Sequence, residues 1–245
     1  MSHERHRYGD KRSQYGELFR PVAAARDGSG RGRGAPPVAV VLHGGFWKAQ
    51  YGRRLTHPLC EDLRGRGWAA WNLEYRRLGR LSGGGWPTTF EDLSAGIDHL
   101  REVQAPLDLA RVVTIGHSAG GHLAALAATR PWPRVSVTGV VSQAGVLDLA
   151  RAWEWRLSGG VVRRLLGGTP EEQPDRYAAA SPAARLPLGV PALLTHGGRD
   201  DIVPVAMSEE FARAAGCELV VDAEAGHFEH LDPAHGLWKA VRKWL

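Results

Sequence analysis

The distribution of apolar positions predicts short buried strands that alternate with amphipathic helices. Apolar runs of a few residues predict strands at 37–43, 68–75, 110–116, 137–145, 190–198 and 217–222. An edge strand at 14–25 and a Gly/Pro-rich turn at 26–37 are expected before them. Helical patterns occupy 51–66, 89–103, 118–130, 211–216 and 236–245. This alternation indicates an α/β fold with a mainly parallel sheet, in which chemistry gathers at the carboxyl ends of the strands.

Length and composition favour one soluble α/β domain over residues 1–245. The chain is 43% hydrophobic and 23% charged, values typical of a protein with one substantial core. Its apolar runs fall short of the roughly 18 residues that span a bilayer, and its first residues lack an apolar signal core. We therefore expect a cytoplasmic protein without membrane association. Cys60 and Cys217 give no disulfide framework and are expected to be buried thiols.

The net charge of +5 raises the alternative of nucleic-acid binding. Most of the excess lies in residues 1–34, which hold eight Lys or Arg against four Asp or Glu. This places the charge in an expected basic tail at 1–16 and in the flexible turn at 26–37. A solubilising end is favoured over an RNA-binding Arg-Gly segment, so no nucleic-acid partner is expected.

The sequence GHSAG at 116–120 matches the G-x-S-x-G pattern of a nucleophile elbow. A predicted strand precedes it and a predicted helix follows it, which is the context that the pattern requires. The sharp turn lifts a serine hydroxyl above the sheet edge, and the small residues around it allow strand and helix to approach. Ser118 is the expected nucleophile. The alternative is a glycine-rich helix start in which Ser118 only caps the helix.

A serine hydroxyl needs a base that a carboxylate orients, and in this type of site the acid and then the base follow the serine along the chain. Asp200 follows the strand at 190–198, and His227 follows the strand at 217–222. Asp201 competes with Asp200. Three other histidines compete with His227. His230 and His235 are expected to be surface residues, and His122 is expected to lie on the helix after the elbow.

The sequence HGGFW at 43–47 follows the first buried strand of the parallel set. Acyl transfer builds negative charge on an oxygen, which backbone N–H donors must stabilise. We expect these donors to be Gly45, Phe46 and Ala119. His43 is interpreted as a structural anchor, because its neighbours do not match the spacing of a zinc site. Neither a metal nor an organic cofactor is expected.

An insertion at about 146–182 is expected to form a small cap beside the site. Its two loop tryptophans, with others at the same end of the sheet, could form an aromatic wall for the substrate. The predicted substrate-binding residues are Trp47, Trp86, Trp153 and Trp155. Trp68 and Trp71 are expected in the core.

Together these motifs resemble the α/β-hydrolase superfamily over nearly the whole chain, and more narrowly its kynurenine formamidase-like and small carboxylesterase branch. The resemblance rests on HGGFW, EYRRLG, GGGWP, GHSAGGHLA, HGGRDDIVP and AGHFEHLDP. It implies an α/β-hydrolase fold with a small cap. It also selects Asp200 over Asp201 and His227 over the other histidines.

The expected function is hydrolysis of a short-acyl ester or aryl formamide, with a small-molecule ester or amide as the partner. Alternatives are a dedicated kynurenine formamidase, a prolyl-oligopeptidase-like peptidase and a non-catalytic ligand-binding member of the fold. The peptidase resemblance rests on LLGGTPEE, but the chain lacks a gating propeller domain. Self-association as a homodimer is left open.

Overall fold

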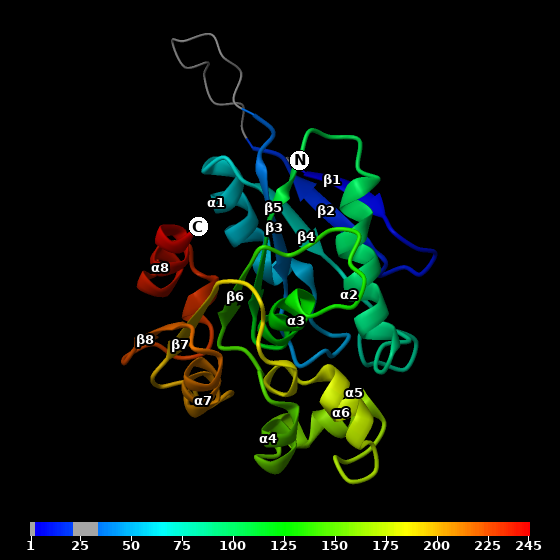
Figure 1. Cartoon of the computed structure of the whole chain (residues 1–245), viewed down its shortest axis with the longest axis vertical. Coiled ribbons are helices and arrows are strands. Elements are labelled where there is room, and N and C mark those ends of the chain that lie inside the picture. The colour runs from blue at the N-terminus through cyan, green and yellow to red at the C-terminus, as the bar shows by residue number, and fades with distance from the viewer. Residues whose placement is uncertain (1–2, 22–33) are drawn as a thin grey trace.

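The computed structural model describes residues 3–21 and 34–245, which share one eight-stranded sheet (Figure 1). The strands are β1 His3–Arg7, β2 Tyr15–Phe19, β3 Pro37–Leu42, β4 Ala69–Leu73, β5 Asp108–His117, β6 Gly139–Gln143, β7 Ala192–Gly197 and β8 Glu218–Asp222. The α-helices are α1 His57–Gly65, α2 Thr88–Asp98, α3 Ala119–Ala128, α4 Leu149–Glu154, α5 Val161–Leu166, α6 Pro174–Ala180, α7 Ala206–Ala215 and α8 Gly236–Trp244.

The strand order is β1-β2-β4-β3-β5-β6-β7-β8. All pairs from β4 to β8 are parallel, whereas β1 pairs with β2 and β2 pairs with β4 in antiparallel fashion. The prediction of a mainly parallel sheet flanked by helices in an α/β-hydrolase fold is confirmed. Part of the predicted edge strand and most of the turn at 26–37 lie outside the described residues.

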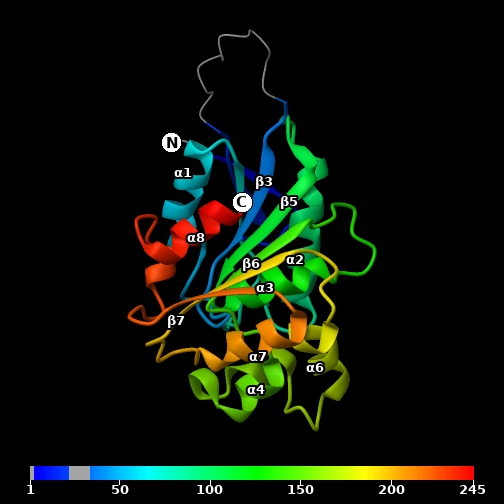
Figure 2. The same ribbon diagram turned by 60° about the vertical axis from the view of Figure 1, so that its left-hand side comes forward.

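The sheet separates two apolar layers, and alternation along each strand decides which side chain enters which layer. In β3, Val38, Val40 and Leu42 face the layer under α2, α3 and α7, whereas Ala39 and Val41 face the layer under α1 and α8. Figures 1 and 2 show α1 and α8 together on one face of the sheet. The helix expected at 51–66 begins later, as a 3-10 turn at Arg53–Thr56 that leads into α1. No described helix is long and apolar enough to cross a membrane.

The prediction of a basic tail over residues 1–16 is wrong for the described part of that segment. Residues 3–7 form β1, the outermost strand. The edge strand expected at 14–25 therefore corresponds to β2, which lies one position in from the edge. Arg5 and His3 reach across to the carboxylate of Glu17, which is fully buried on β2. A charged strand is well suited to a sheet edge, because its side chains discourage pairing with other chains.

Deleting residues 1–7 is therefore expected to reduce stability. The deletion removes the edge strand and takes the Arg5 guanidinium and the His3 ring from the buried Glu17 carboxylate. We expect a loss of about 2 kcal/mol in the free energy of unfolding, or roughly 4–8 °C in Tm. Thermal unfolding, beside a control that lacks only residues 1 and 2, tests this. A Tm equal to that of the control would show that β1 contributes nothing.

The segment expected to form a cap at 146–182 contains α4, α5 and α6. In Figure 1 these helices lie together at the lower end of the molecule, below α3. Hydrogen bonds join this segment to loops or helices of the sheet domain, and three of them are 2.7–2.8 Å long. Lys48 Nζ donates to Ser158 Oγ at 2.7 Å, the Trp86 amide donates to Leu165 O at 2.7 Å, and His122 Nε2 donates to Ala180 O at 2.8 Å.

Candidate active site

Ser118 occupies the sharp turn between β5 and α3. Its backbone has φ 57° and ψ −121°, a conformation that L-residues rarely adopt. The turn is held because the Ser118 amide donates to Gln143 O at 2.8 Å. The Ser118 side chain makes no capping hydrogen bond to α3, so the capping alternative is not supported.

The small residues around Ser118 are required by close backbone contacts. A Cβ on Gly116 would lie 2.0 Å from the carbonyl oxygen of Gly120, and a Cβ on Gly120 would lie 2.1 Å from Leu42 O. Neither distance is possible for a real side chain. The sequence pattern therefore reflects the packing of α3 against the ends of β3 and β5.

Asp200 and His227 lie in direct contact. His227 Nδ1 lies 2.6 Å from Asp200 Oδ2, and both side chains are almost completely buried. The His227 carbonyl accepts a hydrogen bond from His117 Nε2 at 2.7 Å, and the two rings lie 4.6 Å apart. Because His117 precedes Ser118, this contact brings the Asp200–His227 pair to the elbow. Asp201, by contrast, is exposed.

A histidine that the sequence analysis missed, His196, also holds Asp200. Its Nε2 lies 3.2 Å from Asp200 Oδ2, while its Nδ1 lies 2.7 Å from Ser208 Oγ. The amides of Ile202 and Val203 each donate to Asp200 Oδ1 at 2.9 Å. Burial alone would raise the pKa of Asp200, but the hydrogen bonds from His196 and His227 outweigh it and hold that pKa well below its usual range. The carboxylate is therefore charged at neutral pH.

The other candidate histidines have structural roles. The prediction that His230 is a surface residue is wrong: it is fully buried, and its Nδ1 lies 3.1 Å from Thr195 Oγ1. His235 is partly exposed and accepts from the amide of Leu237 at the start of α8. His122 lies on the elbow helix, as expected, and is fully buried.

The buried histidines predict a loss of stability in mild acid. Burial lowers the pKa of His117 to about 3 and that of His122 to about 4, and it holds the pKa of His230 well below its usual range. An unfolded chain, with histidine pKa values near 6.5, takes up protons that the folded chain excludes, so stability falls as the pH drops from about 6.5 toward 4.

The expected slope is about 4 kcal/mol per pH unit near pH 5, or about 1.4 for each of the three histidines. Urea unfolding at pH 7, 6 and 5 measures it. His122→Asn should remove about a third of the slope. A free energy of unfolding that stays constant from pH 7 to 5 would contradict neutral burial of these rings.

The HGGFW loop turns directly over the elbow. A Cβ on Gly44 would lie 2.7 Å from His117 O and 3.0 Å from Ser118 Cβ, so the loop touches the turn that carries the serine. Gly45 and Phe46 both have positive φ, 107° and 48°. Within residues 3–21 and 34–245, no acceptor bonds the backbone N–H of either residue. The N–H of Ala119, the first residue of α3, has no partner within its helix. These three donors are free to meet an anionic oxygen.

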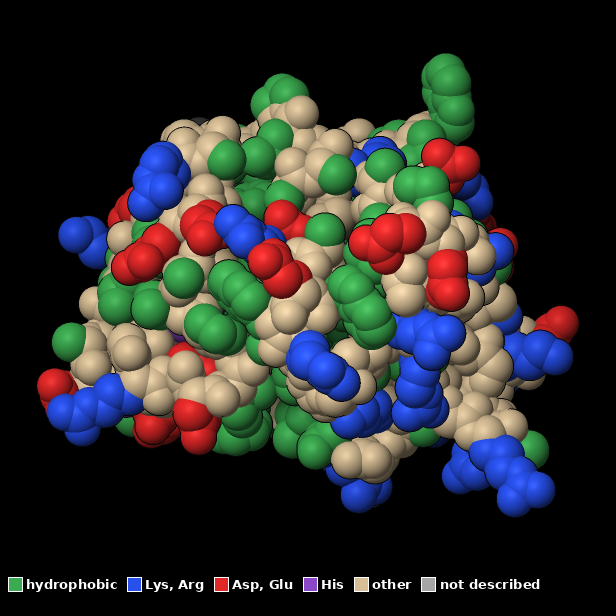
Figure 3. All heavy atoms as spheres, turned by 90° about the horizontal axis from the view of Figure 1, so that it is seen from below, with side chains coloured by type: hydrophobic (Ala, Val, Ile, Leu, Met, Phe, Trp, Pro, Cys, Tyr) green, Lys and Arg blue, Asp and Glu red, His purple; other side chains and the backbone are tan. Residues whose placement is uncertain are grey.

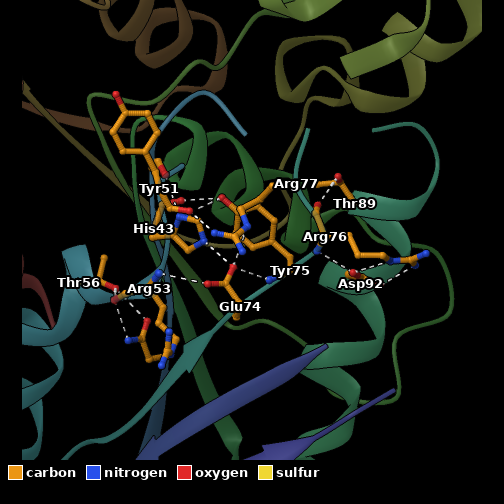
Figure 4. A network of polar contacts seen from close by, with 12 residues as sticks. His43, Tyr51, Arg53, Thr56, Glu74, Tyr75, Arg76, Arg77, Thr89 and Asp92 are labelled. Atoms are coloured by element: carbon orange, nitrogen blue, oxygen red, sulfur yellow. Dashed lines mark hydrogen bonds and ion pairs between the residues drawn. The ribbon is translucent and has the colours of Figure 1, made fainter. Parts of the chain in front are cut away.

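His43 anchors this loop from beneath (Figure 4). Its Nε2 lies 3.0 Å from Glu74 Oε1, and its ring stacks on Tyr75 at 4.5 Å. Glu74 is 2% exposed and also lies 3.3 Å from Arg77 Nε. The structure therefore shows His43 in the anchoring role. Within the described chain, no group of three or more His, Cys, Asp or Glu residues could hold a metal ion.

Trp47 is not a substrate-binding residue, contrary to the prediction. Its backbone has a positive φ of 55°, and its ring is fully buried and donates from Nε1 to His122 Nδ1 at 3.3 Å. A position with positive φ cannot be inferred from the sequence of a non-glycine residue, which explains the error. Trp68 and Trp71 are core residues, as predicted.

The remaining predicted wall residues, Trp86, Trp153 and Trp155, are partly buried against the core layer that includes α3. Phe228, which the sequence analysis missed, is 60% exposed and contacts the His227 ring edge-on at 5.2 Å. An exposed aromatic ring beside the candidate base is a surface that an apolar ligand could cover. Figure 3, which looks at the end of the molecule where α4, α5 and α6 lie, shows apolar side chains exposed among charged ones.

Comparison with known proteins places most of this chain in a family. The BD-FAE family model matches residues 30–214. Esterase LipQ of Mycobacterium tuberculosis is 30% identical over 212 residues, which cover 79% of this chain and 50% of LipQ. The chain spans about half the length of the curated relatives it matches.

Solved structures share the fold over nearly the whole chain. Esterase 2 of Thermogutta terrifontis with butyrate bound has a TM-score of 0.74 and 25% identity, covering 99% of this chain and 90% of the esterase. The same esterase phosphonylated by sarin has a TM-score of 0.75 and 24% identity, covering 98% of this chain and 90% of the esterase.

Proposed function

The chain belongs to the BD-FAE family, and from this premise we propose that it is a serine hydrolase that cleaves carboxylic esters through Ser118, His227 and Asp200. The observation that carries the proposal is the 2.6 Å contact between Asp200 and His227 beside a serine at φ 57°. An acyl-transfer site needs a nucleophile on a strained turn of small residues, as Ser118 is. It also needs a charged carboxylate in contact with a buried imidazole, as Asp200 is with His227.

The chemistry follows from this arrangement. Ser118 Oγ attacks the ester carbonyl carbon while His227 Nε2 accepts the hydroxyl proton. His227 then donates that proton to the departing alkoxide oxygen, which leaves an acyl-enzyme. Water attacks the acyl carbon with the same proton transfers and restores the free serine. Asp200 holds the Nδ1 proton of His227 and stabilises the imidazolium.

The tetrahedral oxyanion would be held by the N–H groups of Gly45, Phe46 and Ala119. No described residue accepts a hydrogen bond from the N–H of Gly45 or Phe46, which supports this role, since preorganised donors need no rearrangement as charge develops. Glu74, through His43, would keep the loop in place against Ser118. The related proteins support an ester substrate: LipQ is named an esterase, and Thermogutta esterase 2 holds butyrate and is phosphonylated by sarin.

We propose a short acyl group and an aromatic leaving group for the substrate. Phe46 directly follows Gly44 and Gly45 of the HGGFW loop, and its ring would crowd the space for the acyl group. Trp47 lies in the core and would not contact the acyl group. The leaving group would lie toward Phe228, Trp86 and the proposed cap segment 146–182 with Trp153 and Trp155.

The chain-length preference is testable with p-nitrophenyl esters from acetate to decanoate. We expect the highest kcat/KM between two and four carbons, because an overfilled pocket costs about 1–3 kcal/mol, or roughly 5- to 150-fold. A maximum at eight carbons or longer would contradict the crowded acyl side.

An aryl formamidase is the second candidate, because the small formyl group suits a crowded acyl side. N-formylkynurenine in the same panel tests it, and absence of turnover would remove it. A peptide amide in the panel tests the peptidase alternative. Failure to turn over any of these substrates would favour a ligand-binding member of the fold.

A further inference from the structure

A cleft of about 980 Å³ lies beside the oxyanion loop and has no assigned role. It lies between the β1–β2 hairpin, the loop after β3 and the loop after β4. None of Ser118, Asp200 and His227 lines it. Tyr51 separates the cleft from the loop that carries Gly45, since a Cβ on Gly45 would lie 2.3 Å from Tyr51 Cβ. The cleft is therefore a neighbour of the proposed catalytic site and distinct from it.

The lining of the cleft is strongly cationic. Among the described residues that line it, Glu74 is the only acidic one. Seven lining residues carry positive charge, namely Arg5, Lys11, Arg12, Arg53, Arg54, Arg76 and Arg77. The acidic side chains that pair with them are Glu17, Glu74, Glu91 and Asp92. Three positive charges are therefore left without a partner in the described structure, although the whole chain carries only +5.

Several of these arginines are held in place before any ligand arrives (Figure 4). The Arg53 guanidinium lies 2.8 Å from Glu17 Oε1 and 4.9 Å from the centre of the Tyr15 ring. Arg5 binds the same carboxylate and lies over the same ring at 4.3 Å. Arg77 is fixed by Glu74 and by the carbonyl of Tyr51. Fixed guanidinium groups lose little entropy on binding a planar or tetrahedral anion.

Other donors in the cleft are unused. The Nε–H of Arg53 is buried and has no acceptor among the described residues. Lys11, Arg12 and Arg54 are exposed, and within the described ranges no acidic side chain lies at ion-pair distance from them. A concave surface with fixed arginines on its floor and free cations at its rim matches an anion with several charges.

We propose that this cleft binds a ligand with two or more neighbouring anionic groups, phosphate or carboxylate. Binding would be dominated by the unpaired rim cations, with the floor arginines setting the geometry. The proposal does not depend on the hydrolase chemistry, because the cleft and the triad share no lining residue.

The experiment is calorimetric titration of the whole chain with inorganic triphosphate and, separately, with citrate. The unmodified protein should bind one equivalent of triphosphate, citrate or both, more weakly at higher salt. Arg12→Gln combined with Arg54→Gln should weaken binding about tenfold or more. Arg12→Lys combined with Arg54→Lys keeps both charges and should retain most of the affinity. Arg213→Gln, an exposed arginine on α7, is the matched control and should change affinity less than about twofold.

The two anions distinguish the ligand class. If the Arg12/Arg54 double variant loses affinity for triphosphate alone, the cleft binds phosphate groups. If it loses affinity for citrate alone, the cleft binds carboxylate groups. A loss of affinity for both anions means that the cleft accepts either group. The proposal is overturned if neither anion binds saturably, or if the Arg12/Arg54 double variant and the Arg213 control bind alike.

Discussion

Replacing Ser118 by Ala is expected to lower kcat for p-nitrophenyl acetate by about 10⁴- to 10⁶-fold. The hydroxyl is the proposed nucleophile, and without it only oxyanion stabilisation and substrate binding remain. The fold should persist, because Ala is small enough for the tight turn and the Ser118 side chain caps no helix. Steady-state kinetics and circular dichroism test both parts.

Ser142→Ala is the matched control for this variant. The Ser142 hydroxyl is buried near the elbow and has no hydrogen-bond partner in the described structure. Its loss should leave activity within about threefold of the parent. Equal activity of the Ser118 and Ser142 variants would place the nucleophile elsewhere.

The second large effect is expected from Asp200→Asn, with a loss of about 10³- to 10⁴-fold in kcat. The amide puts a neutral group opposite the N–H groups of His227 and His196, and its NH₂ end can force His227 into the wrong tautomer. The imidazolium formed during catalysis also loses its counter-charge.

Asp201→Asn is the control for this second variant, because it makes the same chemical change on the neighbouring exposed residue. It should keep activity within about threefold of the parent. In the same way His227→Ala should abolish most turnover, whereas His235→Ala should not. A stronger effect of Asp201 than of Asp200 would mean that the acid has been misassigned.

Sequence patterns predicted the parts of this site whose residue types are dictated by local geometry. GHSAG implied the elbow, because only small residues fit where Gly116 and Gly120 meet the backbone. The positions of Asp200 and His227 followed from strand ends and motif register, and the structure brings the two together. Their catalytic role stays a prediction.

The errors concern features that depend on distant contacts. β1 was missed because its alternating charged residues resemble a solvated tail, and only the buried Glu17 on β2 explains them. His230 was expected at the surface, yet it is buried and contacts Thr195. His230→Ala should therefore destabilise the fold. Trp47 was misplaced because the turn that buries it depends on a positive φ.

Covalent labelling with a fluorophosphonate shows whether Ser118 is an activated nucleophile. We expect one adduct per chain, located by peptide mass spectrometry on the peptide that contains Ser118. We also expect no adduct in Ser118→Ala and much slower labelling in His227→Ala. An adduct on another residue, or an unlabelled folded protein that still hydrolyses p-nitrophenyl acetate, would rule out Ser118 as the nucleophile.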